Sequence, residues 1–121
     1  MSGIDERRRR YRYGWLAETL CAWRLRLSGY RVLARRFKTP VGEIDVVARR
    51  GGTLVFVEVK ARQDGESALY ALTPRQRARI RRAASAFLAA HPECAGLNAR
   101  FDVMVVAPWQ VPHHLIDAWR D

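Results

Sequence analysis

The segment Leu54–Val59 places the strongest constraint on how this chain can fold, because five of its six residues are apolar. Its valines and phenylalanine favour an extended strand, and successive side chains of a strand point to opposite faces of the sheet. Both faces of this strand are therefore apolar and need a cover. The segment predicts a central strand in a sheet that is covered on both sides.

Other segments supply the neighbours of that strand. β-Branched and alternating patterns predict strands, and apolar residues at helical spacing predict helices. The predicted elements are a helix over 13–28, strands over 30–37, 43–48 and 53–60, a helix from Thr73 to just before Pro92, and strands over 100–107 and 115–119. We expect an α/β fold, a mixed sheet of about five strands flanked by helices, with the early strands in an antiparallel meander.

The first predicted helix has two different faces. Its apolar stripe recurs at the spacing typical of a face that packs on a core: Leu16, Leu20, Trp23 and Leu27. The opposite side is mixed and includes one carboxylate: Gly14, Glu18, Cys21 and Leu25. The second helix has a complete start signal, in which Thr73 is the N-cap, Pro74 the first position and Gln76 the partner in a capping box.

The length of the chain fits one domain, predicted over 13–121, preceded by a flexible basic arm over residues 1–12. The 22 Lys and Arg residues exceed the 12 Asp and Glu residues, giving a formal charge of +10. Such an excess attracts polyanions, most commonly nucleic acid, although a ribosome-associated or membrane-surface protein would share it. On the second helix, three arginines share one face and form a candidate phosphate-tracking row: Arg75, Arg79 and Arg82.

The longest uncharged run, over 103–116, contains two prolines and is shorter than the ~20 residues that a membrane helix needs. We therefore expect no membrane association. Cys21 and Cys94 form no C-x-x-C pair, and although one disulfide would also be compatible with the sequence, two isolated cysteines fit a reducing compartment. The expected location is the cytoplasm.

The candidate chemistry lies on two neighbouring strands. Glu58 and Lys60 are two residues apart, so they share a face of their strand, and Asp45 lies on the partner strand. A two-residue hairpin loop at Gly51-Gly52 would pair Asp45 directly with Glu58, whereas a four-residue loop would place it diagonally. Either loop puts both carboxylates on one face.

Carboxylates on adjacent strands repel each other, and a hard cation between them would remove that penalty. Mg²⁺ is commonly held by one or two carboxylates together with waters and substrate phosphate, which predicts a Mg²⁺ or Mn²⁺ site. Lys60 would stabilise charge on the scissile phosphate. The competing interpretation is an ordinary Glu58–Lys60 salt bridge, with Asp45 exposed at a strand end. The apolar character of the strand and the basic character of the chain favour a site.

These motifs carry a family resemblance. Gly14 with Glu18, the run Gly42-Glu43-Ile44-Asp45, the run Phe56-Val57-Glu58-Val59-Lys60, the Thr73 helix and Arg100-Phe101-Asp102-Val103 resemble, in order and spacing, the YraN family of predicted endonucleases. That family is similar to restriction-endonuclease-like proteins, whose signature is P-D…(D/E)-x-K, and to archaeal Holliday-junction resolvases.

The resemblance implies an α-β-β-β-α-β core and a catalytic set of Glu18, Asp45, Glu58 and Lys60, in which the three carboxylates hold the metal. The sequence departs from the family pattern at two positions. Ile44 stands where the signature has proline, and Gln76 stands where many family members have lysine. The expected function is a metal-dependent endonuclease, with DNA favoured over RNA although the sequence does not distinguish them, and with branched or flapped DNA as the favoured substrate by analogy. A nucleic-acid-binding module without turnover is the alternative.

Several features stay open at the level of sequence. Asp102 either supports the site or ends a strand, and His113-His114 point to opposite sides of an extended segment, which does not make a metal pair. Trp109 and Trp119 fit edge packing or an interface better than base stacking. A two-fold homodimer would suit a symmetric DNA junction, but the sequence leaves the oligomeric state undetermined.

Overall fold

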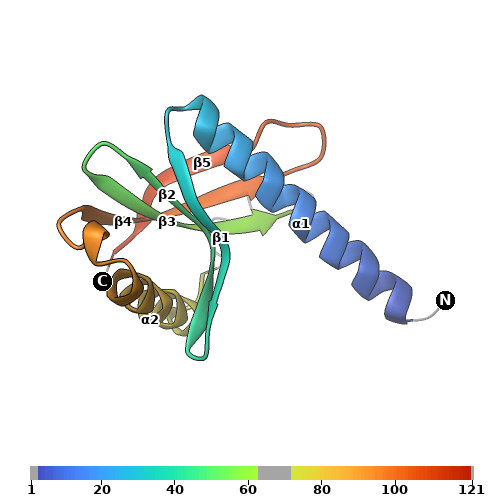
Figure 1. The fold of residues 1–121 in the computed structure, drawn as a ribbon. Coiled ribbons are helices and arrows are strands. Elements are labelled where there is room, and N and C mark those ends of the chain that lie inside the picture. Colours follow the sequence, from blue (N-terminus) through green and yellow to red (C-terminus); the bar gives the residue numbers. More distant parts are fainter. Residues whose placement is uncertain (1–2, 63–71, 121) are drawn as a thin grey trace.

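The structure, a computed structural model, describes residues 3–62 and 72–120, with side chains described from Gly14 onward (Figure 1). Its elements follow in the order α1 (Gly3–Leu27), β1 (Arg31–Thr39), β2 (Gly42–Arg50), β3 (Thr53–Ala61), α2 (Pro74–Ala90), the short 3₁₀ helix η2 (Pro92–Cys94), β4 (Asn98–Val106) and β5 (His113–Trp119). The polar connection predicted over 63–72 lies outside the described residues, except for Leu72.

The five strands form one sheet in the order β1-β2-β3-β4-β5. Strands β1, β2 and β3 are antiparallel neighbours, β3 and β4 are parallel, and β5 returns antiparallel to β4. Strand β3 is central, and α2 lies in the connection from β3 to the parallel β4. The predicted mixed five-stranded sheet with an antiparallel meander is confirmed.

The two helices cover opposite faces of the sheet (Figure 1). On β3, Leu54 and Phe56 belong to the core cluster beneath α2, whereas Val55 and Val57 belong to the cluster beneath α1. All four side chains are buried, which confirms the prediction from the apolar segment. The two cysteines are free, buried and divided between the clusters, Cys21 on the α1 side and Cys94 on the α2 side.

Helix α1 packs on the sheet with the face opposite to the expected one. The residues of its predicted apolar stripe are exposed: Leu16, Leu20, Trp23 and Leu27. The side chains buried against the sheet come from the mixed face and its neighbours: Ala17, Glu18, Cys21, Ala22 and Leu25. Small residues at this contact let the helix approach the sheet closely, and this possibility is invisible to a search for large apolar side chains. The assignment of the stripe as the core face was therefore wrong.

The helix also begins earlier than expected. It starts at Gly3, so that most of the predicted basic arm is the first part of a 25-residue helix, which in Figure 1 projects beyond the sheet. Arginine is among the better helix formers, so a run of four arginines does not stop a helix. At the other end Gly29 has a φ of +88°, and the N–H groups of Gly29 and Tyr30 donate to the carbonyls of Arg26 and Leu25, as in a Schellman motif. Within the described residues, no helix combines the length and apolarity needed to cross a membrane.

Two local predictions are confirmed in detail. Thr73 caps α2 through its hydroxyl, and Gln76 completes the capping box by accepting from the Thr73 N–H at 2.9 Å. The hairpin between β2 and β3 turns at Gly51-Gly52, with Arg50 paired to Thr53 and Gly51 at a φ of +59°. The turn therefore selects the shorter of the two predicted loops.

Candidate functional site

The predicted Glu58–Lys60 pair lies near the end of β3. The Lys60 Nζ is 3.5 Å from the Glu58 Oε1, so both side chains point to the same face of the strand. Glu58 and Lys60 are mostly buried, with 20% and 12% of their side chains exposed. In so little water, each charge depends strongly on its neighbour.

Asp45 approaches this pair from β2. The antiparallel ladder between β2 and β3 is regular as far as Val46 and Val57. One residue further, the Asp45 side chain accepts a hydrogen bond from the Val59 N–H at 2.8 Å. The carboxyl groups of Asp45 and Glu58 also interact, since each alters the pKa of the other. The two predicted carboxylates are thus brought together beside Lys60.

Both carboxyl groups have pKa values above the ordinary range of their side chains. Burial, and after it the neighbouring Glu58 carboxylate, raise the pKa of Asp45 to about 7. Burial also raises the pKa of Glu58, although the Lys60 ammonium opposes that shift. Their burial therefore disfavours the charged forms of both carboxyl groups, and a bound cation would offset that penalty.

The strand geometry around Asp45 is irregular. On β1, Arg35 pairs with Val46 and Phe37 with Ile44, while Arg36 between them has a φ of +51°. A non-glycine residue with this left-handed backbone is strained. On β2, Ile44 and Val46 pack in opposite core clusters even though they are two residues apart. The regular alternation of side chains along β2 is therefore broken around Asp45.

Glu18 comes to the same region from α1 but already has a partner. The Arg36 Nε lies 2.9 Å from each oxygen of the buried Glu18 carboxylate. Burial raises the pKa of Glu18, Arg36 lowers it, and the charge of Asp45 raises it. Glu18 is therefore an electrostatic neighbour of Asp45 that an arginine holds in an ion pair.

A cavity of about 170 Å³ opens beside Glu58. Its lining combines two carboxylates of the sheet with residues of α2: Glu43, Glu58, Gln76, Arg79 and Ile80. Gln76, which stands where the family resemblance implies a lysine, thus lies next to the carboxylates. The Gln76 carbonyl oxygen is engaged in the capping box, so this side chain has a structural role as well as a place in the cavity wall.

Gly42 explains how α2 comes so near. A Cβ at this position would lie 2.3 Å from the Arg79 carbonyl oxygen, a distance at which atoms clash. Only glycine allows the start of β2 to pass against the α2 backbone. The glycine of the Gly42-Glu43-Ile44-Asp45 run therefore sets the distance between the carboxylates and the basic helix.

Arg75, Arg79 and Arg82 are all exposed and lie on one side of α2, as predicted. Arg79 also lines the cavity beside Glu58. In the part of the chain that the structure describes, no group of three or more His, Cys, Asp or Glu side chains is arranged to hold a metal ion. Of the three predicted ligands, Asp45 and Glu58 lie together as a carboxyl pair. Glu18 instead forms an ion pair with Arg36.

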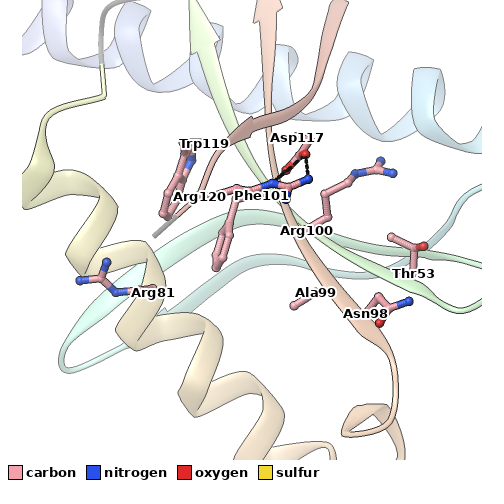
Figure 2. Close-up of a pocket in the computed structure, with 9 residues that line it drawn as sticks. All are labelled: Thr53, Arg81, Asn98, Ala99, Arg100, Phe101, Asp117, Trp119 and Arg120. Atoms are coloured by element: carbon pink, nitrogen blue, oxygen red, sulfur yellow. Dashed lines mark hydrogen bonds and ion pairs between the residues drawn. The ribbon is translucent and has the colours of Figure 1, made fainter.

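A larger hollow of about 570 Å³ lies at the other end of the sheet (Figure 2). It begins at Thr53, five residues before Glu58, which corresponds to roughly 17 Å along a strand. Trp119 and Phe101 stack on one side of it, with ring centroids 4.2 Å apart. Its acid, Asp117, is paired with Arg120. The predicted carboxylates do not line this hollow. Trp119 is buried, which confirms its prediction as a packing residue, whereas Trp109 is fully exposed.

Asp102, which the sequence left undecided, is completely buried in a cluster of donors. It accepts from the Arg100 guanidinium at 2.8 and 2.9 Å, lies 2.6 Å from the His114 Nε2, and accepts from the Asp117 N–H at 2.8 Å. The Tyr30 hydroxyl accepts a further bond from Arg100. Burial raises the pKa of Asp102, but these donors together lower it below its ordinary value. The residue supports the fold and stands apart from the carboxyl pair.

Arg36 and Glu43 belong to the region but were not predicted. The charge of Glu43 acts on both Asp45 and Glu58. Its spacing of two residues from Asp45 was a usable signal, since such residues share a face of a regular strand. Arg36 carried no signal, because its orientation depends on the left-handed backbone.

Residues 17–106 match the model of a family described as uncharacterised protein family UPF0102. The chain belongs to the UPF0102 family. A UPF0102 protein of Parvibaculum lavamentivorans is 56% identical over 110 residues, covering 91% of this chain and 83% of the relative. UPF0102 proteins of Rhodopseudomonas palustris and Paramagnetospirillum magneticum are 54% and 52% identical, covering 94% and 90% of this chain and 88% of each relative. The matched UPF0102 region contains the carboxyl pair, Lys60 and α2.

Proposed function

We propose that this chain is a metal-dependent endonuclease that hydrolyses phosphodiester bonds of DNA. One observation carries the proposal: two carboxyl groups from neighbouring strands, Asp45 and Glu58, lie together beside the Lys60 ammonium in a mostly buried position. Two carboxyl groups with raised pKa values and a nearby ammonium are an arrangement that folding alone does not favour. The adjoining cavity and the basic face of α2 provide room and charge for a polyanion.

The carboxyl pair fits a hard divalent ion. Its donors are oxygens from two adjacent strands, and Mg²⁺ is commonly held by one or two carboxylates with waters and phosphate oxygens completing its shell. Once bound, Mg²⁺ or Mn²⁺ would lower the pKa of a coordinated water and polarise the phosphate. Asp45 and Glu58 would hold the ion, and Glu18 would join them only after leaving Arg36.

The remaining residues have roles that follow from their positions. Lys60 presents a compact positive charge beside Glu58, where it would stabilise charge that develops on the scissile phosphate. Arg79 lines the same cavity and would hold a neighbouring phosphate, with Arg75 and Arg82 extending the contact along α2. The acidic residues thus hold the cation and the basic helix holds the substrate.

The resemblance of the motifs to the YraN family and to restriction-endonuclease-like proteins supports this assignment, since Asp45, Glu58 and Lys60 occupy the positions of its signature. By analogy with resolvases, branched DNA is the substrate we expect. The analogy with resolvases supports only the proposed substrate class. The proposed reaction rests on the carboxyl pair.

One set of contacts favours the alternative, a nucleic-acid-binding module without turnover. Glu18 is paired with Arg36, and Glu58 with Lys60, so two of the three predicted ligands already have a basic partner. In that case DNA would bind equally well with and without a chelator.

A cleavage assay tests the proposal. Purified protein is incubated with linear, flapped and four-way DNA in Mg²⁺, in Mn²⁺ and in chelator. We expect metal-dependent products, and Lys60→Ala should lower the rate by about a hundredfold or more. Lys60→Arg should also be impaired, since a planar guanidinium does not replace a compact ammonium.

Lys38 supplies the control, because it is the other lysine of the chain and is exposed on β1. Lys38→Ala should cleave at nearly the parent rate. If no substrate yields a metal-dependent product at high protein concentration, or if Lys60→Ala cleaves normally, the proposal is overturned in favour of the binding module.

A further inference from the structure

The outward face of α1 is apolar and uncovered. Leu27 is 82% exposed, Trp23 58%, Leu16 47% and Leu20 40%. They share the side of the helix that points away from the sheet, because Ala17, Cys21 and other residues of the opposite side are buried beneath it. Single exposed apolar residues are ordinary, but four on one helical face form a contiguous patch, which marks an interaction surface.

The spacing of these residues specifies the kind of partner. From Leu16 to Leu20, Trp23 and Leu27 the steps are four, three and four residues, which is the alternation of a and d positions in a coiled coil. Such a seam is narrower than the apolar stripe of a helix that lies on a membrane or packs on a large core. The face is therefore shaped to receive one other helix.

The apolar area of the face fits the centre of a standard interface. With about 250 Å² for a fully exposed tryptophan and less for a leucine, the four side chains offer roughly 400 Å² of apolar surface. A standard interface buries ~800 Å² per partner, of which the centre is apolar and the rim polar. Thr19, Arg24 and Arg26 flank the stripe in sequence and would form that polar rim.

We propose that this face packs against α1 of a second copy of the chain, with the two helices antiparallel. A parallel pair would place the Arg7–Arg10 segments of both copies side by side, and an antiparallel pair moves them to opposite ends. Antiparallel packing about a two-fold axis between Leu20 and Trp23 brings Leu20 of each copy to Trp23 of the other, and Leu16 to Leu27. The interface is self-complementary, as two-fold symmetry requires.

The inference is independent of the proposed enzymatic function, because none of these residues lies at the carboxyl pair. It is tested by measuring the mass of the full chain in solution, by light scattering and sedimentation over a range of concentrations. We expect a dimer for the parent. Trp23→Gln should raise the dimer dissociation constant about a hundredfold or more, since a buried tryptophan is a typical hot spot and a symmetric interface contains it twice.

Trp109 supplies the matched control. It is the same residue type and fully exposed, but it lies in the β4–β5 loop, so Trp109→Gln should leave the dimer unchanged. Leu20→Gln is a second interface variant, and thermal melts would show that each variant is folded. A parent chain that stays monomeric at about 100 μM, or a dimer that Trp23→Gln and Leu20→Gln leave intact, overturns the proposal. A monomer that binds anionic phospholipid vesicles through Trp23 would overturn it in favour of a membrane surface.

Discussion

Asp45 and Asp102 lie on the two strands that flank β3, and their surroundings are opposite. Asp102 is enclosed by donors from Arg100, His114 and the Asp117 backbone, and its pKa is lowered despite its burial. Asp45 has one backbone donor, and its burial together with the charge of the Glu58 carboxylate raises its pKa to about 7. Both groups are acids in the same sheet, but only one of them has its negative charge balanced.

The difference separates a structural acid from a candidate ligand. A buried carboxylate that serves the fold acquires enough donors to stay ionised. One that awaits a cation stays short of donors, because the cation supplies the missing positive charge. The contrast between the two aspartates, rather than the motif alone, is the strongest argument for chemistry at Asp45.

Removing the charge of Asp102 should have the largest effect on stability. Asp102→Asn leaves the Arg100 guanidinium partly buried without its ionic partner, and breaking a buried pair costs about 3–5 kcal/mol. Urea unfolding at pH 7 measures the loss. If Asp102→Asn is as stable as the parent, the assignment of Asp102 as a structural acid is wrong and the comparison fails.

Asp45→Asn should have the opposite effect on stability and make the folded protein more stable. A carboxyl group whose folded pKa is raised disfavours folding above that pKa, and the penalty disappears below its unfolded value near 4. The variant should therefore be more stable than the parent at pH 8, by a few kcal/mol, and the difference should vanish as the pH falls from about 7 to 4. The asparagine keeps an acceptor for the Val59 N–H.

The same comparison predicts the shape of the parent's pH profile. Stability should rise as the pH falls from 8 to about 5, because Asp45 takes up its proton. It should then decrease below about pH 4, because protonation of Asp102 removes a favourable charge. Glu93→Gln, in which an exposed acid of η2 is neutralised, should follow the parent profile. A destabilised Asp45→Asn at pH 8 would instead indicate that Asp45 is a structural partner.

The stabilisation of the folded state by a metal ion should be a somewhat smaller effect, and it should depend on Asp45. A ligand that binds only the folded state at ~100 times its Kd adds about 2.7 kcal/mol. Mg²⁺ or Mn²⁺ should stabilise the parent by this order and should have no such effect on Asp45→Asn. Thermal melts in a metal titration give the answer, and an unresponsive parent would remove the metal from the proposal.

The fold was largely predictable because its signals are local. The apolar run of β3, the Gly51-Gly52 turn and the Thr73 capping box each specify their own geometry within a few residues. The face of α1 could not be predicted in this way. Periodicity finds the apolar stripe from Leu16 to Leu27, but it does not say whether a sheet or a second copy of the chain will cover it.

The candidate site likewise contains contacts that local sequence signals predict and contacts that they do not. The hairpin turn fixes the register that brings Asp45 near Glu58 and Lys60, although the regular ladder ends one residue before Asp45. The donors of Asp102 come from residues that only the tertiary fold assembles, such as His114 on β5 and Arg100 with its Tyr30 partner. The Glu18–Arg36 ion pair likewise depends on one left-handed residue. Long-range contacts of these kinds leave no pattern in the sequence.

The smallest expected effect comes from comparing an arginine beside Glu58 with an arginine that contacts Tyr30 near the Asp102 cluster. Arg79 lines the cavity beside Glu58, whereas Arg50 stacks over Tyr30, 4.5 Å from the ring centroid, next to the Asp102 cluster. Both are exposed, so each substitution by glutamine removes one positive charge with little effect on packing.

If nucleic acid follows α2, only Arg79 neutralises a phosphate. The slope of log affinity against log salt should then become shallower by about 0.9 for Arg79→Gln and stay unchanged for Arg50→Gln. Binding is measured by fluorescence anisotropy with a labelled duplex in chelator, so that cleavage does not intervene. Equal slopes for the two variants would mean that the bound strand does not distinguish the two regions, and the α2 row would lose its role as the nucleic-acid contact.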